Sequence, residues 1–471
     1  MCRGRKSIAV RLSLRIACFV TALGIASPAG AQAPPLARLI PLALADAAET
    51  EPRPAPDDGV HHFVIGDLTP SPSELNAALA LQMTTFPVSV AWEGAPATSL
   101  GAGRPELPAY RSVPRSSFAE RATTLGQDSL SVGFTQQSYH YRALDGLDIE
   151  SDEVRFFLEH NNCCGPSADP SAATDLEPAF ERDLLEQALS VDMDRTVYAF
   201  AVGYGVTSRL DVGATLPLVK VNLRTRVTSR LRRTVTAGSV TPHRFDPLEV
   251  EHRTTYADGT AHGLGDIALR AKYALLETAG GGLAASVSVT LPTGDAANLL
   301  GSGVTRTEGR VIWSERFGGR WGAHVNGSYT RSTGDAADEL GLPTNGLDDT
   351  ALELTVPDEI GAVAGVDVPL LPRVAVSADL VMRHLRGLSR FDAGETRFPS
   401  RGPGRLPSAA FVAPDNLQVT GRETDVTQLF TAIGVRLHLG RALLLSADAL
   451  FPVVDQGFVP RGVVVGFSMA Q

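Results

Sequence analysis

The stretch Arg209-Leu-Asp-Val-Gly-Ala-Thr-Leu-Pro-Leu-Val219 alternates between apolar side chains and polar or small ones. The apolar set takes every second position: Leu210, Val212, Ala214, Leu216 and Leu218. The positions between them hold Arg209, Asp211, Gly213 and Thr215. Successive side chains of a β-strand point to opposite faces, so this period of two predicts a strand with one apolar and one polar face.

The same alternation recurs from residue 129 to the C-terminus, for example in 265–275, 283–291, 321–329 and 373–383. It predicts that this part of the chain is all-β. We expect about twelve strands, with fourteen as an alternative, near 129–142, 194–206, 209–222, 262–277, 281–292, 305–317, 320–332, 357–369, 373–386, 426–439, 441–451 and 459–469.

The connections between these strands alternate in length. Tight turns are expected at 207–208, 278–280, 318–319, 370–372 and 440. The other gaps are 143–193, 223–261, 293–304, 333–356, 387–425 and the shorter 452–458. Short periplasmic turns and long outer loops are typical of a transmembrane antiparallel up-and-down β-barrel, whereas the crossovers of a β-sandwich need not alternate. Most of the strands also reach the roughly 9–11 residues that a tilted strand needs to cross a membrane.

The first residues have the layout of a cleavable signal peptide. A basic start with Arg3, Arg5 and Lys6 precedes the apolar stretch 16–25, and Ala29-Gly30-Ala31 offers small residues for cleavage after Ala31. The apolar stretch is too short for a spanning helix, which needs roughly 20 residues. We therefore expect residues 1–31 to be a signal peptide and the protein to be exported.

The charge of the mature chain excludes one class of partner. Cleavage removes five of the 42 basic residues and none of the 52 acidic ones, which leaves a net charge of −15. Because nucleic-acid binding depends on a basic surface, we expect no nucleic-acid partner. Cys163 and Cys164 are adjacent and cannot staple a fold, and with Glu159 and His160 they match no established metal spacing. We expect no metal and no cofactor.

Residues 32–128 differ from the rest because they are rich in Pro, Ala and Ser. A helix is expected near 73–82 and a strand-like run at 84–92, which ends in Trp92. We interpret this part as a plug that enters the barrel or a segment on the periplasmic side, with an unstructured leader as the alternative. Residues 129–471 would form the barrel itself.

Charged side chains on the strands must avoid lipid, where Arg or Lys near the midplane costs about 2–4 kcal/mol. They are therefore expected to point into the lumen. The candidates for lining it are Asp211, Asp266, Arg270, Lys272, Arg310, His324, Asn326, Asp379, Arg383, Arg436 and Asp448. Because both signs are present, these groups either pair across strands and fill the interior or form a polar constriction through which a solute passes.

Several runs together resemble a known outer-membrane family. They are Phe118-Ala119-Glu120-Arg121, Leu144-Asp145-Gly146-Leu147, YGVTSRLDVG (204–213), GLGDIALRAKY (263–273), LPTGD (291–295) and LGSG (300–303). From about residue 118 onward the chain resembles the family assigned to transport in the phenol meta-cleavage pathway, which includes a sphingosine-related porin-like protein. The resemblance implies an outer-membrane barrel that takes up small hydrophobic or aromatic molecules, with outer-membrane lipid and the barrel-insertion machinery as partners.

Two other functions are open on the sequence. A barrel of twelve strands encloses little space, so a non-conducting barrel that acts through its long loops is the main alternative. His324, Asn326 and Ser328 share one face of a strand, which raises the possibility of a barrel hydrolase. Their spacing gives no clear nucleophile–base geometry, so we do not expect an enzyme.

Overall fold

The computed structural model describes residues 34–48, 63, 70–90, 117–160, 183–232, 245, 251–278, 280–317, 321–334, 356–398, 411–439 and 443–470. The chain divides into two units, Met1–Pro34 and Pro35–Gln471. The second unit contains every strand and helix described below. Among the described residues, no helix is both long and apolar enough to cross a membrane.

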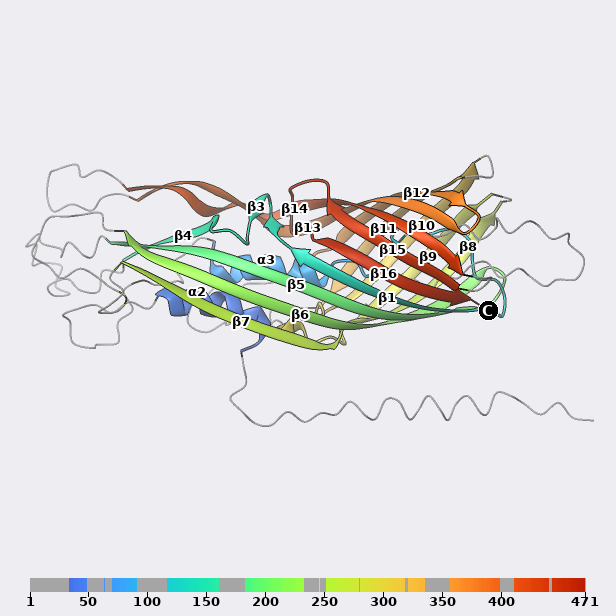
Figure 1. Cartoon of the computed structure of the whole chain (residues 1–471), viewed down its shortest axis with the longest axis horizontal. Coiled ribbons are helices and arrows are strands. Elements are labelled where there is room, and N and C mark those ends of the chain that lie inside the picture. The colour runs from blue at the N-terminus through green and yellow to red at the C-terminus, as the bar shows by residue number, and fades with distance from the viewer. Residues whose placement is uncertain are drawn as a thin grey trace, which may run out of the picture. The chain divides into compact units, whose positions relative to one another are not determined.

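Twelve strands form a closed antiparallel barrel (Figure 1). In order around the wall they are β1 (Leu130–Tyr141), β5 (Leu184–Gly205), β6 (Leu210–Arg232), β8 (Ile267–Glu277), β9 (Gly282–Leu291), β10 (Thr305–Phe317), β11 (Trp321–Thr333), β12 (Glu359–Leu371), β13 (Val374–Phe398), β14 (Phe411–Leu439), β15 (Leu443–Pro452) and β16 (Arg461–Ala470). The ring closes where β16 pairs with β1, from Ser131 opposite Ala470 to His140 opposite Arg461. This confirms the predicted fold class and strand number.

One predicted strand is in fact two. The segment 262–277 consists of β8 and the end of β7 (His252–Leu264), and both of these strands pair with β6. Residues Gly265 and Asp266 separate them. The Gly265 amide still donates to the Pro217 carbonyl of β6 at 2.9 Å, but the Gly265 carbonyl accepts from Thr293 Oγ1 of the loop after β9 at 2.7 Å.

The long gaps expected as loops contain much additional strand. β5, β6, β13 and β14 have 22, 23, 25 and 29 residues, and they continue beyond the barrel at the end opposite the tight turns. β4 (Val154–Glu159) and β7 add to them, and a hairpin of β2 (Ala143–Leu144) and β3 (Leu147–Asp148) lies alongside. We call β4, β7 and the continued parts of the four long strands the extension (Figure 1). The thickness of a membrane limits only the part of a strand that crosses it, so these strands can continue to pair beyond that part.

The inside of the extension is filled by η2 (Leu36–Arg38), α2 (Leu39–Ala48) and α3 (Pro72–Thr84). α3 starts where the Ser71 side chain accepts a bond from the Glu74 amide, with Pro72 at the first helical position. Nearly every residue of α3 is buried, so its polar side chains need partners: Gln82 Oε1 accepts from the Phe458 amide at 2.7 Å. The predicted helix is therefore confirmed.

The strand-like run predicted at 84–92 is wrong where it can be judged. Thr84 is the last residue of α3, and residues 85–90 are irregular. Their backbone bonds to side chains of the barrel wall: Ser89 donates its amide to Gln137 Oε1 at 3.0 Å, and its carbonyl accepts from Thr135 Oγ1 at 3.0 Å. Residues 91 and 92 lie outside the described residues.

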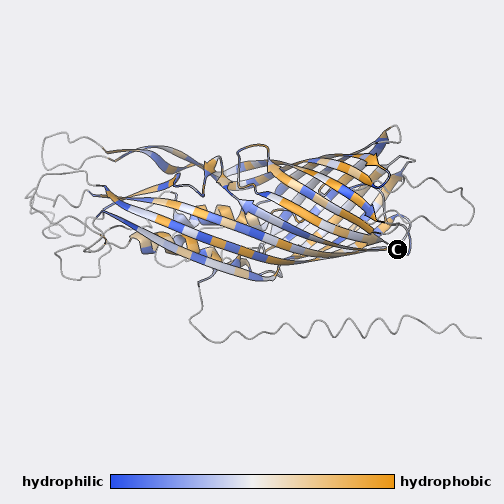
Figure 2. Ribbon diagram, in the orientation of Figure 1, coloured by the Kyte–Doolittle hydropathy of each residue, from blue (hydrophilic) through white to orange (hydrophobic). Residues whose placement is uncertain are grey.

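Hydrophobic and hydrophilic residues alternate along the strands of the barrel (Figure 2), and the exposed large apolar side chains form a band on its outside. Exposed members lie on successive strands, with Leu269, Val287, Val311, Val325 and Val465 among them. Aromatic rings gather at the tight-turn end, where Phe317 stacks on Trp321 with ring centroids 4.6 Å apart. Aromatic residues are typical of the boundary between membrane and water, so this outer surface is one that faces lipid.

Candidate functional site

The segment 117–125 crosses the lumen of the barrel and bonds to its wall on several sides. Two successive amides of this segment donate to Asp379 Oδ2, at 3.0 and 3.3 Å. A third donates to Asn326 Oδ1 at 2.7 Å, and a fourth to both carboxylate oxygens of Asp211, at 2.9 and 3.1 Å. These three wall residues belong to β13, β11 and β6. Their buried polar groups are thus satisfied by a chain segment that is not part of the sheet.

Glu120 supplies the main acidic group of this segment. It forms ion pairs with Arg270 of β8 and with Arg310 of β10, the latter at 2.8 Å. Arg310 also pairs with Glu308 on its own strand at 2.9 Å. The two arginines project from neighbouring parts of the wall, so Glu120 fixes the segment between them.

Arg121 makes a second ionic contact. Its guanidinium lies 2.5 Å from Asp367 Oδ1, which also lies 2.5 Å from His324 Nε2. His324 is 3% exposed and Asp367 is fully buried. The nearby Lys272 donates to the carbonyl of Thr123 at 2.9 Å.

This network bears on the hydrolase alternative. His324 is engaged by Asp367, and Asn326 is engaged by the backbone of Glu120 in both directions. Among the contacts of the residues that the structure describes, neither side chain bonds to Ser328. A nucleophile and its base must lie within hydrogen-bond reach, so this group lacks the arrangement that hydrolysis needs.

Two further clusters of charge line the interior. Arg383 of β13 donates to both oxygens of Glu359 at 2.9 Å, and Arg306 of β10 donates to the same carboxylate at 2.9 Å. Both arginines also donate to the carbonyl of Thr85, just after α3. On the adjacent strands β14 and β15, Arg436 pairs with Asp448 at 2.8 Å. Buried charges are costly unless paired, and these are paired.

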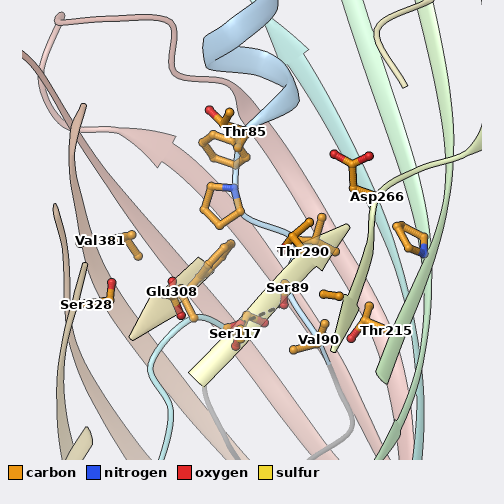
Figure 3. Close-up of a pocket in the computed structure, with 18 of the residues that line it drawn as sticks. Thr85, Ser89, Val90, Ser117, Thr215, Asp266, Thr290, Glu308, Ser328 and Val381 are labelled. Atoms are coloured by element: carbon orange, nitrogen blue, oxygen red, sulfur yellow. Dashed lines mark hydrogen bonds between the residues drawn. The ribbon is translucent and has the colours of Figure 1, made fainter. Parts of the chain in front are cut away.

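A cavity of about 300 Å³ lies inside the barrel, between these clusters. Its wall includes residues of the irregular segments 84–90 and 117–120 as well as inward-facing side chains of the strands. Figure 3 shows Ser89, Val90 and Ser117 on one side, with Thr290 and Glu308 pointing toward the same space. The lining mixes apolar, hydroxyl and charged groups, so it can receive a small solute with both apolar and polar parts.

Asp266 holds a folded loop at the edge of this cavity. Its carboxylate accepts from the amide of Gly294 at 3.0 Å and from the amide and hydroxyl of Ser302 at 2.7 and 2.8 Å. A Cβ at Gly301 would lie 2.3 Å from Asp266 Oδ1, so only glycine allows this approach. The runs GLGD, LPTGD and LGSG thus meet at one carboxylate, and LPTGD does more than form a turn.

The structure places all of the predicted lumen residues on the inner side of the wall. Ten of the eleven bond to residues 85–90 or 117–125 or belong to the cavity lining, Asp448 through the Ser117 hydroxyl, while His324 pairs with Asp367. Sequence reasoning missed Glu120, Asp367, Glu359 and Arg195 as interior groups. Glu359 and Asp367 alternate with apolar residues on β12, so the same period of two pointed to them. Arg195 lies between Asp194 and Thr196 and shares its face with apolar residues, so the alternation gave no signal for it.

Two possible metal-binding groups were considered. Among the described residues, His140, Asp192 and Asp194 lie close enough together to hold an ion. His140 however bonds through both ring nitrogens, to Asp194 at 2.9 Å and to Glu150 at 2.7 Å. His160 of the sequence cluster packs edge-on against Phe63, and Cys163 and Cys164 lie outside the described residues.

The helices of the N-terminal part lie inside the extension. α2 and α3 occupy the extension, at the end of the barrel opposite the tight turns: Gln187 donates to the carbonyl of Leu44 at 2.9 Å, and Ser229 to that of Ala47 at 2.8 Å. The physical reason is that the extension offers an apolar inner surface that these helices cover.

The closed barrel with its lipid-facing band defines a transmembrane β-barrel. Residues 185–350 match the family model described as "Putative MetA-pathway of phenol degradation". This bears out the resemblance seen in the sequence, over a narrower range than residues 118 to 471.

Solved structures of similar fold include outer-membrane proteins. The COG4313 outer membrane channel from Pseudomonas putida F1 is 13% identical, with 76% of this chain and 100% of that chain covered and a TM-score of 0.38. The P. putida toluene transporter TodX is 9% identical, with 73% and 89% covered and a TM-score of 0.28. A FadL homologue of Pseudomonas aeruginosa is 10% identical, with 73% and 89% covered and a TM-score of 0.28. No curated protein matches the sequence.

Proposed function

We propose that this protein is an outer-membrane channel of a Gram-negative bacterium for passive uptake of small hydrophobic or aromatic compounds. The observation that carries the proposal is the cavity of about 300 Å³ inside a closed barrel whose outer surface is apolar. This volume is at the small end of the range for ligand pockets and suits a solute with a single ring. The family match at residues 185–350, described by phenol degradation, supports the same class of solute.

The lining of the cavity also suits such a solute. Phe86 and Phe118 both lie against Phe430, with ring centroids 5.1 and 5.4 Å apart. Val88, Val90 and the hydroxyl groups of the strands complete a surface that is partly apolar. Aromatic rings prefer offset or edge-to-face contact with other rings, which this cluster offers.

We further propose that residues 32–128 act as a plug and that the tight turns face the periplasm. The bonds of residues 85–90 and 117–125 to the inner wall support the first point, because they occupy space that water would otherwise fill. Under this orientation the extension with α2 and α3 faces outside the cell. The signal peptide and the even number of strands are consistent with it.

A pair of deletions tests the plug. Removal of residues 32–115 takes away α2, α3 and the segment 85–90, whereas removal of 32–125 also takes away the segment that crosses the lumen. We expect ion conductance in planar bilayers to rise in the first variant and to rise further in the second. Heat-modifiable gel mobility controls for folding. Conductance equal to that of the full chain in both folded variants contradicts the plug.

Uptake of a labelled aromatic compound tests the channel itself. Intact cells that make the protein should take up toluene faster than cells with an empty vector. Thr290→Trp, which fills the cavity from β9, should abolish this difference, while Val287→Trp on the lipid face of the same strand should preserve it. The main alternative is a non-conducting barrel, which the filled extension favours. It predicts no difference between any of these cells.

A further inference from the structure

Among the residues that the structure describes, those that line the cavity in the barrel carry more positive than negative charge. Six arginines line it: Arg195, Arg270, Arg306, Arg310, Arg383 and Arg436. Four carboxylates line it: Glu120, Asp266, Glu308 and Glu359. Asp448, just beyond the lining, pairs with Arg436 and reduces the surplus to one. An enclosed surplus charge is unfavourable, so the position of the odd arginine matters.

Arg195 is that arginine. It projects from β5, is 3% exposed, and donates from Nη1 to the carbonyl of Met83 at 3.1 Å. Its Nε has no hydrogen-bond partner, which is equally true of Arg270, Arg306 and Arg310, but among the described residues no carboxylate forms an ion pair with Arg195. By contrast, Arg306 and Arg383 share Glu359, and Arg270 and Arg310 share Glu120.

The end of α3 does not supply the missing charge. The carbonyl groups of Met83 and Thr85 at its C-terminus accept from Arg195, Arg306 and Arg383. The C-terminus of a helix carries the equivalent of about half a negative charge. One helix end and one carboxylate, Glu359, therefore face three arginines, and the cluster still lacks an anion.

Aromatic side chains lie beside this cluster. Phe86 contacts Tyr139 edge-on at 5.1 Å, and Tyr139 lies within electrostatic reach of Arg195. The guanidinium of Arg383 lies 5.6 Å from the centre of the Phe86 ring. The cavity thus has a cationic part and an aromatic part next to each other.

We propose that the cavity binds small aromatic monoanions, with the carboxylate of an arenecarboxylate at Arg195 and its ring against Phe86. This inference rests on the proposed channel function and names its solute class. An anion needs a protein route across a membrane more than a hydrocarbon does, because transfer of a charge into an apolar medium is prohibitive. Charge-assisted bonds to a guanidinium are also among the stronger ones available in a buried site.

Calorimetry on the full-length protein in detergent tests the proposal with two probes that share a ring. Benzoate carries the charge and benzamide does not. We expect benzoate to bind the native protein about tenfold more tightly than benzamide, as expected of one charge-assisted hydrogen bond. Arg195→Gln should remove this preference, because benzoate then loses its charge-assisted bond and binds about as weakly as benzamide. Arg209→Gln, at an exposed turn, is the matched control and should keep the preference.

Each result decides the matter. Equal affinity of the native protein for the two probes overturns the proposal, whatever the variants do. A preference that survives Arg195→Gln overturns the assignment to Arg195. If the Gln variant loses heat-modifiable mobility, Arg195→Lys takes its place: it keeps the charge on a shorter side chain and should weaken benzoate more than benzamide. Failure of toluene uptake with retained benzoate preference would refute the wider channel proposal for neutral compounds and leave this one standing.

Discussion

An arginine placed on the lipid face of β8 should strongly destabilise the barrel. Leu269 is 47% exposed and lies in the middle of the apolar band, paired with Ala214 and Val289. Leu269→Arg puts a charge near the membrane midplane, at a cost of about 2–4 kcal/mol. Leu276, 58% exposed, lies close to the tight turn, where the same change costs only about 0–1 kcal/mol. The expected difference between the two variants is therefore about 2–3 kcal/mol.

Urea unfolding in lipid vesicles, followed by heat-modifiable gel mobility, measures this difference. Arg270→Leu, one position along and on the inner face, is the control for the face assignment. It removes one ion pair of Glu120, which keeps its bond to Arg310 at 2.8 Å, so membrane insertion should be retained. Equal stability of the Leu269 and Leu276 variants would refute the placement of Leu269 near the membrane midplane. Failed insertion of the Arg270 variant would refute the assignment of Arg270 to the inner face.

Three further predictions concern single features. In a background without the native cysteines, a cysteine at Arg397 of the extension should react with a membrane-impermeant label on intact cells, and one at Ser208 should not; the reverse pattern would invert the orientation. Asp266→Asn puts an amide group against three hydrogen-bond donors and should cost about 2–4 kcal/mol in urea unfolding, with faster proteolysis of the loop that it holds. Burial opposes ionisation of Asp148, but bonds from Arg142 and a backbone amide outweigh it and hold the pKa of this carboxyl below its usual range. The stabilisation that results is present above the usual pKa and is lost as the pH falls through the lowered pKa. Hydrogen exchange at residues 143–152, corrected for intrinsic rates, should therefore become faster in acid in the native protein. The Asp148→Asn variant should show no such step.

The period of two predicted the barrel well because both faces of a membrane-spanning strand are constrained: the face toward lipid must be apolar, and the charged residues must point inward. On β6, Asp211 and Thr215 point inward and Val212 and Leu216 point outward, as the sequence indicates. The same rule could not place the break between β7 and β8. Gly265 and Asp266 fit the alternation, and their bonds to a loop some 30 residues later cannot be read from it.

The inner wall was predictable residue by residue, but its partners were not. Asp211, Asn326 and Asp379 follow from alternation, while the amides that satisfy them belong to a segment with no regular period. The extension was also missed, because its strands pack on helices as a soluble domain does. β6 illustrates this, since its outward residues change from apolar at Leu218 to basic at Lys220 where the band ends.

The route of the segment 117–125 constrains the order in which the molecule can be assembled. This segment is enclosed by a ring that exists only once β16 has paired with β1, and residues 126–129 join it directly to β1. After the ring has shut, a free chain would have to be drawn through an occupied interior. We therefore expect β1 and β16 to pair while the segment 117–125 already lies inside the barrel. The polar groups of the wall then bond to this segment in the same step that removes the last open sheet edges.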